Sequence, residues 1–325
     1  MLLLEVLMRP VRFRFGWFVV ALIAALLLPA TAWSSPASAA PAPGSPAPAA
    51  PSDPAVLAGA NDFSCRPSAA HPRPVVLVHG TWSTMTGTWK VLAPALKKEG
   101  YCVFALDYGK REPNSLENLL NLAGGDAIAR SAGTLAQFVT KVRTTTRAAQ
   151  VDIVGHSQGA LVARQYLKFN GGTDAKDPSR NAVHTLVSLA GTNHGTTFNF
   201  NQLIGLAGQA LGIPVVTLAA TAVGPSYIEQ MIGSPFLRRL NDGGDTRAGV
   251  DYVAVGSRGD NVVTPTAGTF LTAGPGATVR NVWVQDGCPD ALVDHMTITS
   301  APRATWIVLD ALDPKYGRTH RAPCA

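Results

Sequence analysis

Residues 151–169 read VDIVGHSQGALVARQYLKF. The first residues are a short, mostly apolar run typical of a buried strand, and residues 158–169 have the length and spacing of a helix. Between them lies a Gly-x-Ser-x-Gly pattern centred on Ser157. In such a strand–turn–helix layout the turn lifts the serine above the sheet, and glycines flank it because neighbouring backbone comes close. The stretch therefore predicts a nucleophile elbow; a glycine-rich turn with an idle serine is the alternative.

On both sides of the elbow, short apolar runs alternate with helical segments. Continuous apolar strands separated by helices are typical of a parallel sheet covered on both faces, with right-handed crossovers. We therefore expect an α/β fold with a mostly parallel central sheet and helices on both faces. The expected strands are residues 75–78, 101–106, 151–154, 184–189, 250–255 and 281–284, and the main helices are 89–98, 126–147, 158–169 and 300–312.

Length and composition fit one catalytic domain. The chain has 325 residues, of which 46% are hydrophobic and 15% are charged, which is enough for a sizeable core. The net charge is +6. Three arginines and one glutamate near the N-terminus contribute +2 of it, which leaves +4 for the rest of the chain. No run of basic residues is interleaved with aromatic ones, so we expect no nucleic-acid partner.

The N-terminal 39 residues have the features of a signal peptide. A basic stretch precedes the apolar run 17–28, and Ala37-Ser38-Ala39 is an A-x-A cleavage site. We therefore expect a secreted, extracellular or envelope-associated protein. A membrane anchor is the alternative, but the run is shorter than the about 20 residues that cross a bilayer. Either Met1 or Met8 could begin the chain.

The rest of the chain divides into a linker and a catalytic domain. Residues 40–59 are rich in proline and alanine, a composition typical of an extended linker. The catalytic domain is expected over residues 60–325.

Four cysteines follow the expected cleavage site: Cys65, Cys102, Cys288 and Cys324. An even number in an exported protein indicates two disulfides, for which three pairings are possible. We favour Cys65–Cys102 and Cys288–Cys324, because each pair closes a local loop at one end of the domain. No C-x-x-C spacing is present, so a metal site is not expected.

A serine becomes a good nucleophile only when a base takes its proton. The base should be a histidine that follows the serine in the chain, oriented by a carboxylate. His295 fits best, since it lies in the loop between the last strand and the closing helix. His156 is adjacent to Ser157 and should point away from it. The other histidines lie at a strand-end turn, at a strand start, in the GTNHGT segment or near the domain ends: His79, His184, His194, His71 and His320.

The orienting carboxylate is expected directly after the strand 250–255. Asp260 stands there, in GSRGDNVVTP, whereas Asp251 begins that strand and belongs to the other sheet edge. Three aspartates close to His295 remain rivals: Asp286, Asp290 and Asp294.

Stabilising a developing oxyanion requires preorganised N–H donors. One should be the amide of Gln158, the residue after the nucleophile. The second should come from the loop after the first strand, where we choose Thr81, with its amide and also its hydroxyl as candidates. Trp82 is expected to pack against the site or in the core.

Six segments together resemble the class 2 family of secreted bacterial lipases and esterases: LVHGTW, YCVFALDYG, VGHSQGA, LAGTNHGT, GDNVVTP and CPDALVDH. The resemblance spans roughly residues 62–324 and implies the α/β-hydrolase fold, with Ser157, Asp260 and His295 as the catalytic triad. It also implies carboxylester hydrolysis without a cofactor, on acylglycerols or simple esters.

Residues 198–240 depart from the smallest family members. The segment is long, apolar and punctuated by glycines. It is either an ordinary helical crossover or a cap. We expect it to line an acyl groove and partly cover the nucleophile, fixed or slightly mobile because Pro214 and Pro225 stiffen it.

These features predict a lipase or esterase that binds an ester or lipid substrate, contacts lipid surfaces transiently and acts as a monomer. Acyl transfer or thioester hydrolysis could use the same residues. The alternative from a different functional class is a cell-surface binding protein that has this fold but no catalytic activity.

Overall fold

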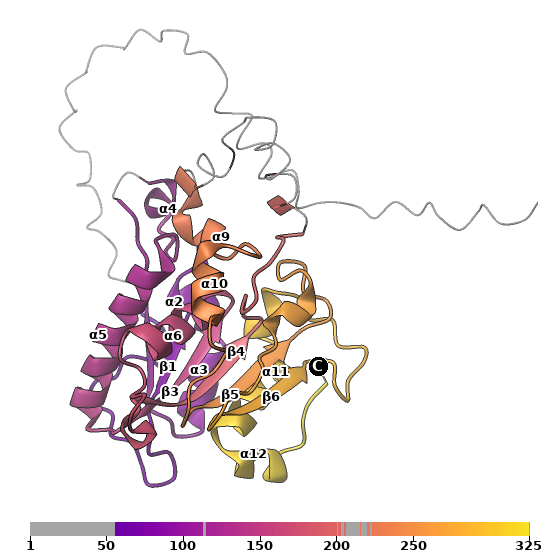
Figure 1. Ribbon diagram of the computed structural model, residues 1–325. Helices are drawn as coiled ribbons and strands as arrows, with labels where there is room; N and C mark the ends of the chain where they lie inside the picture. Colours follow the sequence, from indigo (N-terminus) through magenta and orange to yellow (C-terminus); the bar gives the residue numbers. More distant parts are fainter. Residues whose placement is uncertain are drawn as a thin grey trace, which may run out of the picture. The chain divides into compact units, whose positions relative to one another are not determined.

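Six parallel strands form the centre of the structure, a computed structural model that describes residues 56–112, 115–199, 201–202, 205, 215, 220–221 and 223–324 (Figure 1). These residues belong to one compact unit. The strand order is β2-β1-β3-β4-β5-β6, and every neighbouring pair is parallel, which confirms the predicted α/β fold. The strands are β1 Val75–Val78, β2 Val103–Leu106, β3 Val151–His156, β4 Val183–Leu189, β5 Asp251–Gly256 and β6 Thr278–Trp283.

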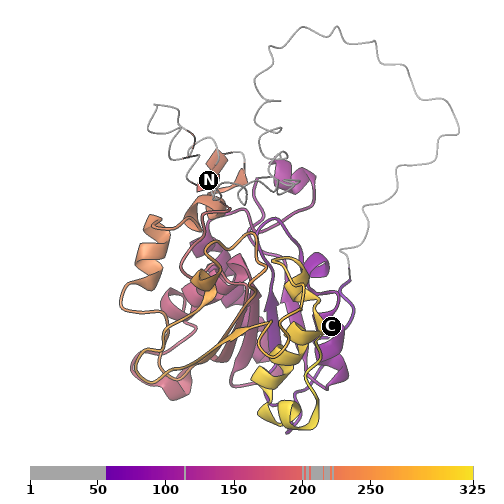
Figure 2. The ribbon, with the colours of Figure 1, turned by 90° about the vertical axis from the view of Figure 1, so that its right-hand side faces the viewer.

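Helices cover both faces of the sheet (Figures 1 and 2). One face packs against α5 (Ile128–Thr146), α6 (Gln158–Phe169) and α10 (Pro235–Asn241). The other packs against α3 (Leu92–Lys98) and α11 (Pro302–Leu312). Successive side chains of β1 alternate between the two cores. Because both faces are buried, a central strand is apolar throughout and appears in the sequence as an uninterrupted run.

The expected helix 89–98 is two helices. The structure has α2 at Met85–Trp89 and α3 at Leu92–Lys98. Thr84 begins α2, because its side chain accepts a hydrogen bond from the amide of Gly87. A continuous helix would need an N–H at Pro94, which proline lacks, so the chain begins a new helix with Pro94 in its first turn.

Other elements are short or begin earlier than predicted. The last strand begins at Thr278 rather than 281. It is a partly exposed edge strand in which Thr278, Arg280 and Asn281 are polar, so it lacks the apolar run of a central strand. The remaining helices are α4 Leu116–Leu119, α9 Pro225–Glu229 and α12 Pro314–Thr319, with 3-10 helices at Pro178–Arg180, Thr266–Thr269 and Thr297–Thr299.

The packed region includes residues ahead of position 60. Leu57 is only 4% exposed and belongs to the core on the α3 and α11 side of the sheet, so the domain extends slightly into the expected linker. The expected signal peptide and most of that linker lie outside the described residues. None of the helices in the described part of the chain is long and apolar enough to cross a membrane.

Two disulfides cross-link opposite ends of the domain. Cys65 pairs with Cys102 and Cys288 pairs with Cys324, which is the pairing favoured from the sequence. The first joins the segment before β1 to the residue before β2. The second joins the loop that follows β6 to the C-terminal segment, and that loop also carries His295.

Candidate active site

Ser157 lies at a sharp turn between β3 and α6, as the motif predicts. Its backbone has φ 54° and ψ −124°, a conformation that non-glycine residues adopt only under strain. A side chain on Gly159 would place its Cβ 2.2 Å from the Val78 carbonyl oxygen, and one on Gly155 would place it 2.7 Å from the Ala160 amide nitrogen. Both glycines are therefore required for α6 to begin directly against β1 and β3.

Three side chains from distant parts of the chain meet at this turn. His295 Nε2 lies 2.9 Å from Ser157 Oγ, and His295 Nδ1 lies 2.9 Å from Asp260 Oδ2. Asp260 Oδ1 accepts hydrogen bonds from the amides of Val262 and Val263, each at 2.8 Å. All three side chains are buried. The arrangement can transfer a proton from the serine to an imidazole whose orientation is set by a fixed carboxylate.

The rival carboxylates lie elsewhere. Asp286 and Asp290 are exposed, and the carboxylate of Asp294 accepts hydrogen bonds from the amides of Met296 and Thr297. Asp251, at the start of β5, accepts a hydrogen bond from Thr278 at the far edge of the sheet. Within the described part of the chain, Asp260 is therefore the carboxylate that reaches His295.

Thr81 and Gln158, the two residues chosen for the oxyanion hole, lie side by side. Thr81 Oγ1 donates to Gln158 Oε1 at 3.1 Å and accepts from Gln230 Nε2 at 2.9 Å. The hydroxyl proton is thus committed to Gln158, so the hydroxyl considered as an extra donor is not free here. Gln158 is the first residue of α6, where a backbone N–H has no acceptor within the helix.

Gln230 was not identified from the sequence. It is 1% exposed, and its Oε1 accepts a hydrogen bond from the Thr192 hydroxyl at 3.0 Å. A glutamine at the end of a five-residue helix has no local pattern that marks it. Only the fold brings it to Thr81, which is 149 positions away.

Trp82 links the loop that carries Thr81 to part of the segment 198–240. Its ring stacks on Tyr227 with centroids 5.6 Å apart, and Tyr227 stacks on Phe198 at 4.2 Å. Trp82 Nε1 donates to Glu117 Oε1 and to the Val223 carbonyl, and burial raises the pKa of Glu117. Most of residues 200–222 lies outside the described residues, so the acyl groove and the mobile lid stay predictions.

Two further histidines are buried beside the site. His156 Nε2 lies 2.8 Å from the backbone oxygen of His295, and His79 Nδ1 lies 2.7 Å from the Gly80 carbonyl oxygen. Burial, with a smaller contribution from the neighbouring His295, lowers the pKa of His156 to about 3. Burial also lowers the pKa of His79. Both imidazoles are therefore neutral at neutral pH.

We predict a loss of stability in acid that depends on these two histidines. In the unfolded chain both imidazoles take up protons below about pH 6.5. In the folded chain the pKa of His156 is about 3 and that of His79 is also lowered, so unfolding binds protons and stability falls as the pH drops below 6.5. Each fully titrating imidazole contributes about 1.4 kcal/mol per pH unit. Urea unfolding between pH 5 and 8 measures the slope. His156→Gln should make the slope shallower; an unchanged slope would contradict the prediction.

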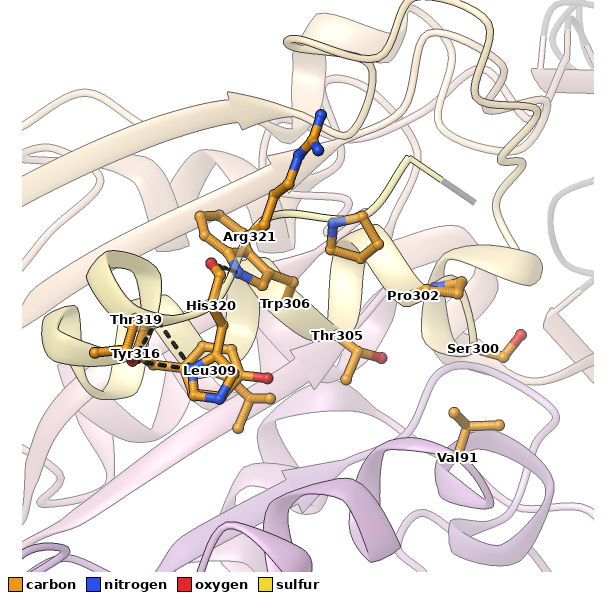
Figure 3. Close-up of a pocket in the computed structure, with 11 residues that line it drawn as sticks. Val91, Ser300, Pro302, Thr305, Trp306, Leu309, Tyr316, Thr319, His320 and Arg321 are labelled. Carbon is orange, nitrogen blue, oxygen red and sulfur yellow. Dashed lines mark hydrogen bonds between the residues drawn. The ribbon is translucent and has the colours of Figure 1, made fainter.

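A separate hollow of about 560 Å³ lies between α11, α12 and the C-terminal segment, with Val91 on its other side (Figure 3). Its walls include Trp306, Tyr316 and His320. Ser157, Asp260 and His295 do not line it, so it is not part of the site described above. In the described parts of the chain no group of three or more His, Cys, Asp or Glu side chains could hold a metal ion.

Two solved lipase structures are similar to this chain. Aspergillus fumigatus lipase B matches with a TM-score of 0.57 and 21% identity, over 81% of this chain and 55% of that one. Bacillus licheniformis lipase BlEst2 in its mature form matches with a TM-score of 0.48 and 16% identity, over 76% of this chain and 94% of that one. The chain thus spans little more than half the length of the Aspergillus lipase. At 21% identity the match to the Aspergillus lipase shows the fold alone, which is the α/β-hydrolase fold.

No curated protein matches the sequence. A family model described as "Lipase (class 2)" matches residues 72–282, from the residues before β1 to the last strand. This range covers more than half of the chain and includes the elbow, the Thr81 loop and Asp260. The chain therefore belongs to the class 2 lipase family.

Proposed function

We propose that the protein is a secreted carboxylester hydrolase that cleaves acylglycerols or simple esters through a Ser-His-Asp acyl-enzyme mechanism. The observation that carries the proposal is the pair of 2.9 Å contacts joining Ser157, His295 and Asp260. Family membership supports the lipolytic reaction class.

In the first half of the reaction, His295 Nε2 takes the proton of Ser157 as Oγ attacks the ester carbonyl carbon. The carbonyl oxygen becomes an oxyanion, which the backbone amides of Thr81 and Gln158 stabilise. The C–O bond to the alcohol then breaks, and His295 gives its proton to the departing oxygen. In the second half, His295 takes a proton from water, the hydroxide attacks the acyl-enzyme, and the acid leaves as Ser157 regains its proton.

Asp260 contributes by holding one orientation of the imidazole. Its Oδ2 accepts from His295 Nδ1, which leaves Nε2 free to accept the serine proton. The two backbone amides that bind Oδ1 prevent the carboxylate from rotating. A buried carboxylate in this position also stabilises the imidazolium that forms during each half-reaction.

Exposed apolar side chains near the site favour lipid substrates over short, water-soluble esters. Leu292 and Met296, which flank His295 in the sequence, are 99% and 63% exposed. Leu119 and Leu120 are also exposed, and the segment after them pairs with the Thr81 loop through a bridge between Ser83 and Ala123. Apolar surface gathered around a site is typical of contact with an apolar ligand or a lipid surface.

Export from the cytoplasm is part of the proposal. Two disulfides in one domain are typical of proteins that fold in an oxidising compartment. The exported chain should begin after Ala39. N-terminal sequencing of the protein recovered outside the cell checks the cleavage site.

The test combines a fluorophosphonate probe with a series of nitrophenyl esters from acetate to palmitate. We expect one label, on Ser157, and turnover of esters with medium or long acyl chains. Labelling without turnover of any ester would point to acyl transfer or thioester hydrolysis, and absence of labelling would favour the idle binding protein.

The two disulfides should differ in their effect on turnover. They enclose loops of nearly equal length, with sequence separations of 37 and 36, so each should stabilise the fold by roughly 4 kcal/mol in the chain-entropy model. Of the two disulfides, only Cys288–Cys324 restrains the loop that carries His295. Replacing this pair by serines should lower both the free energy of unfolding and kcat. Replacing Cys65 and Cys102 should lower the free energy of unfolding but leave kcat unchanged. Equal kcat values for the two double variants would contradict this.

A further inference from the structure

The backbone around His295 has few regular hydrogen bonds. The residue lies between β6 and α11, where the described secondary structure is one 3-10 helix, Thr297–Thr299. The carboxylate of Asp294 shapes the turn through the amides of Met296 and Thr297. These local bonds define the turn, and the Ser257 hydroxyl, directly after β5, donates to the Val293 carbonyl two residues before His295. Neither contact holds the backbone of His295 itself against β3, the strand that leads to Ser157.

His156 connects the backbone of His295 itself to β3. It is the last residue of β3 and directly precedes Ser157. Its Nε2 lies 2.8 Å from the backbone oxygen of His295, and the centroids of the two rings are 4.9 Å apart. The two residues are 139 positions apart in the chain, so this contact joins the elbow directly to the catalytic loop.

The same ring also touches the loop after β1. A Cβ on Gly80 would lie 3.1 Å from His156 Nδ1 and 3.1 Å from the Cβ of Ser157. His156 is 3% exposed, and it fills the space between the loop that carries Thr81 and the loop that carries His295. A shift of this ring would therefore displace both loops relative to the nucleophile.

The hydrogen bond fixes the tautomer of His156, and burial keeps the ring neutral. A carbonyl oxygen only accepts, so Nε2 carries the proton and donates it. The groups that face the ring are the imidazoles of His295 and His79. A second positive charge beside His295 would oppose the imidazolium that the mechanism requires, so a neutral donor suits this position.

We propose that His156 is a positioning residue, which holds the backbone of His295 at the elbow through its Nε2–H···O=C hydrogen bond and so sets the distance from His295 Nε2 to Ser157 Oγ. The proposal rests on the proposed function, because it assumes that His295 is the base. A displacement of about 1 Å at a reacting group can cost about 100-fold in rate.

The experiment compares two replacements of similar length. His156→Gln keeps an N–H donor with similar reach, and His156→Met removes it. We expect His156→Met to lower kcat by about 10- to 100-fold with KM within about twofold, and His156→Gln to recover most of the loss. Active-site titration with the phosphonate normalises each value to folded enzyme. Equal kcat values for the two variants would overturn the proposal.

A double-mutant cycle with Asp260→Asn separates positioning from general loss of structure. If His156 and Asp260 both act by orienting His295, Asp260→Asn should lower kcat by a smaller factor in the His156→Met variant than in the wild type. Fully independent effects of His156→Met and Asp260→Asn on kcat would therefore also count against the proposal. Should His156→Met fail to fold, His156→Asn, whose amide is too short to reach the carbonyl, replaces it in the comparison.

Failure of the proposed function gives a different result. In that case the wild-type protein itself would hydrolyse no ester, whether or not the phosphonate labels it. An active wild type with indistinguishable His156 variants would refute only the positioning role.

Discussion

Ser157→Ala is expected to lower kcat by about 10⁶-fold, the loss typical of removing a triad serine. The hydroxyl is the atom that becomes acylated, and a water molecule in its place cannot form the covalent intermediate. The fold should persist, because Ser157 Oγ has its described hydrogen bond to His295 alone, and alanine has no bulk that serine lacks. Ester turnover and the midpoint of urea unfolding measure the two effects.

A buried serine outside the site provides the control. Ser131 on α5 is 1% exposed, and its hydroxyl has no hydrogen-bond partner among the described residues, so Ser131→Ala should keep wild-type kcat. Near-normal turnover by Ser157→Ala, with normal phosphonate labelling, would remove the nucleophile assignment.

Asp260→Asn is expected to lower kcat by about 10⁴-fold. The asparagine Oδ1 can still accept from the amides of Val262 and Val263, so the loop should stay in place. Its Nδ2 would then face His295 Nδ1 as a donor. The imidazole must accept there and carry its proton on Nε2, which leaves no base for the serine.

Two nearby aspartates serve as matched controls. Asp290 is exposed, and the carboxylate of Asp294 bonds within its own turn. We expect Asp290→Asn to be neutral and Asp294→Asn to have a small effect, with the kcat of each measured under the same conditions as for Asp260→Asn. If Asp290→Asn or Asp294→Asn instead causes the large loss of kcat, the orienting carboxylate has been assigned to the wrong residue.

The central strands and the elbow could be predicted because they are buried on both faces and therefore continuously apolar. Thr81, Ser157, Asp260 and His295 each follow a strand of a parallel sheet, and the carboxyl ends of such strands share one edge. The edge strand β6 was harder to predict from the sequence because half of its residues are polar. The break between α2 and α3 was harder to predict because it depends on the missing N–H of Pro94.

The contacts that hold the site together could not be predicted. The bonds from Gln230 to Thr81 and from His156 to His295 join segments more than 130 positions apart. Their existence depends on how loops pack after the sheet forms, and no local spacing records it. His156 was expected only to point away from Ser157; its bond to the carbonyl of His295 required the structure.

All-parallel strand pairing has a practical consequence for handling the protein on solid supports. The proposed triad lies beyond the carboxyl ends of the strands, so the amino ends form a face on the opposite side of the sheet. Lys176 is exposed in the connection that leads from α6 into β4, at that opposite face. Covalent coupling to a resin through Lys176 would turn the site towards the bulk phase, where emulsified substrate could reach it.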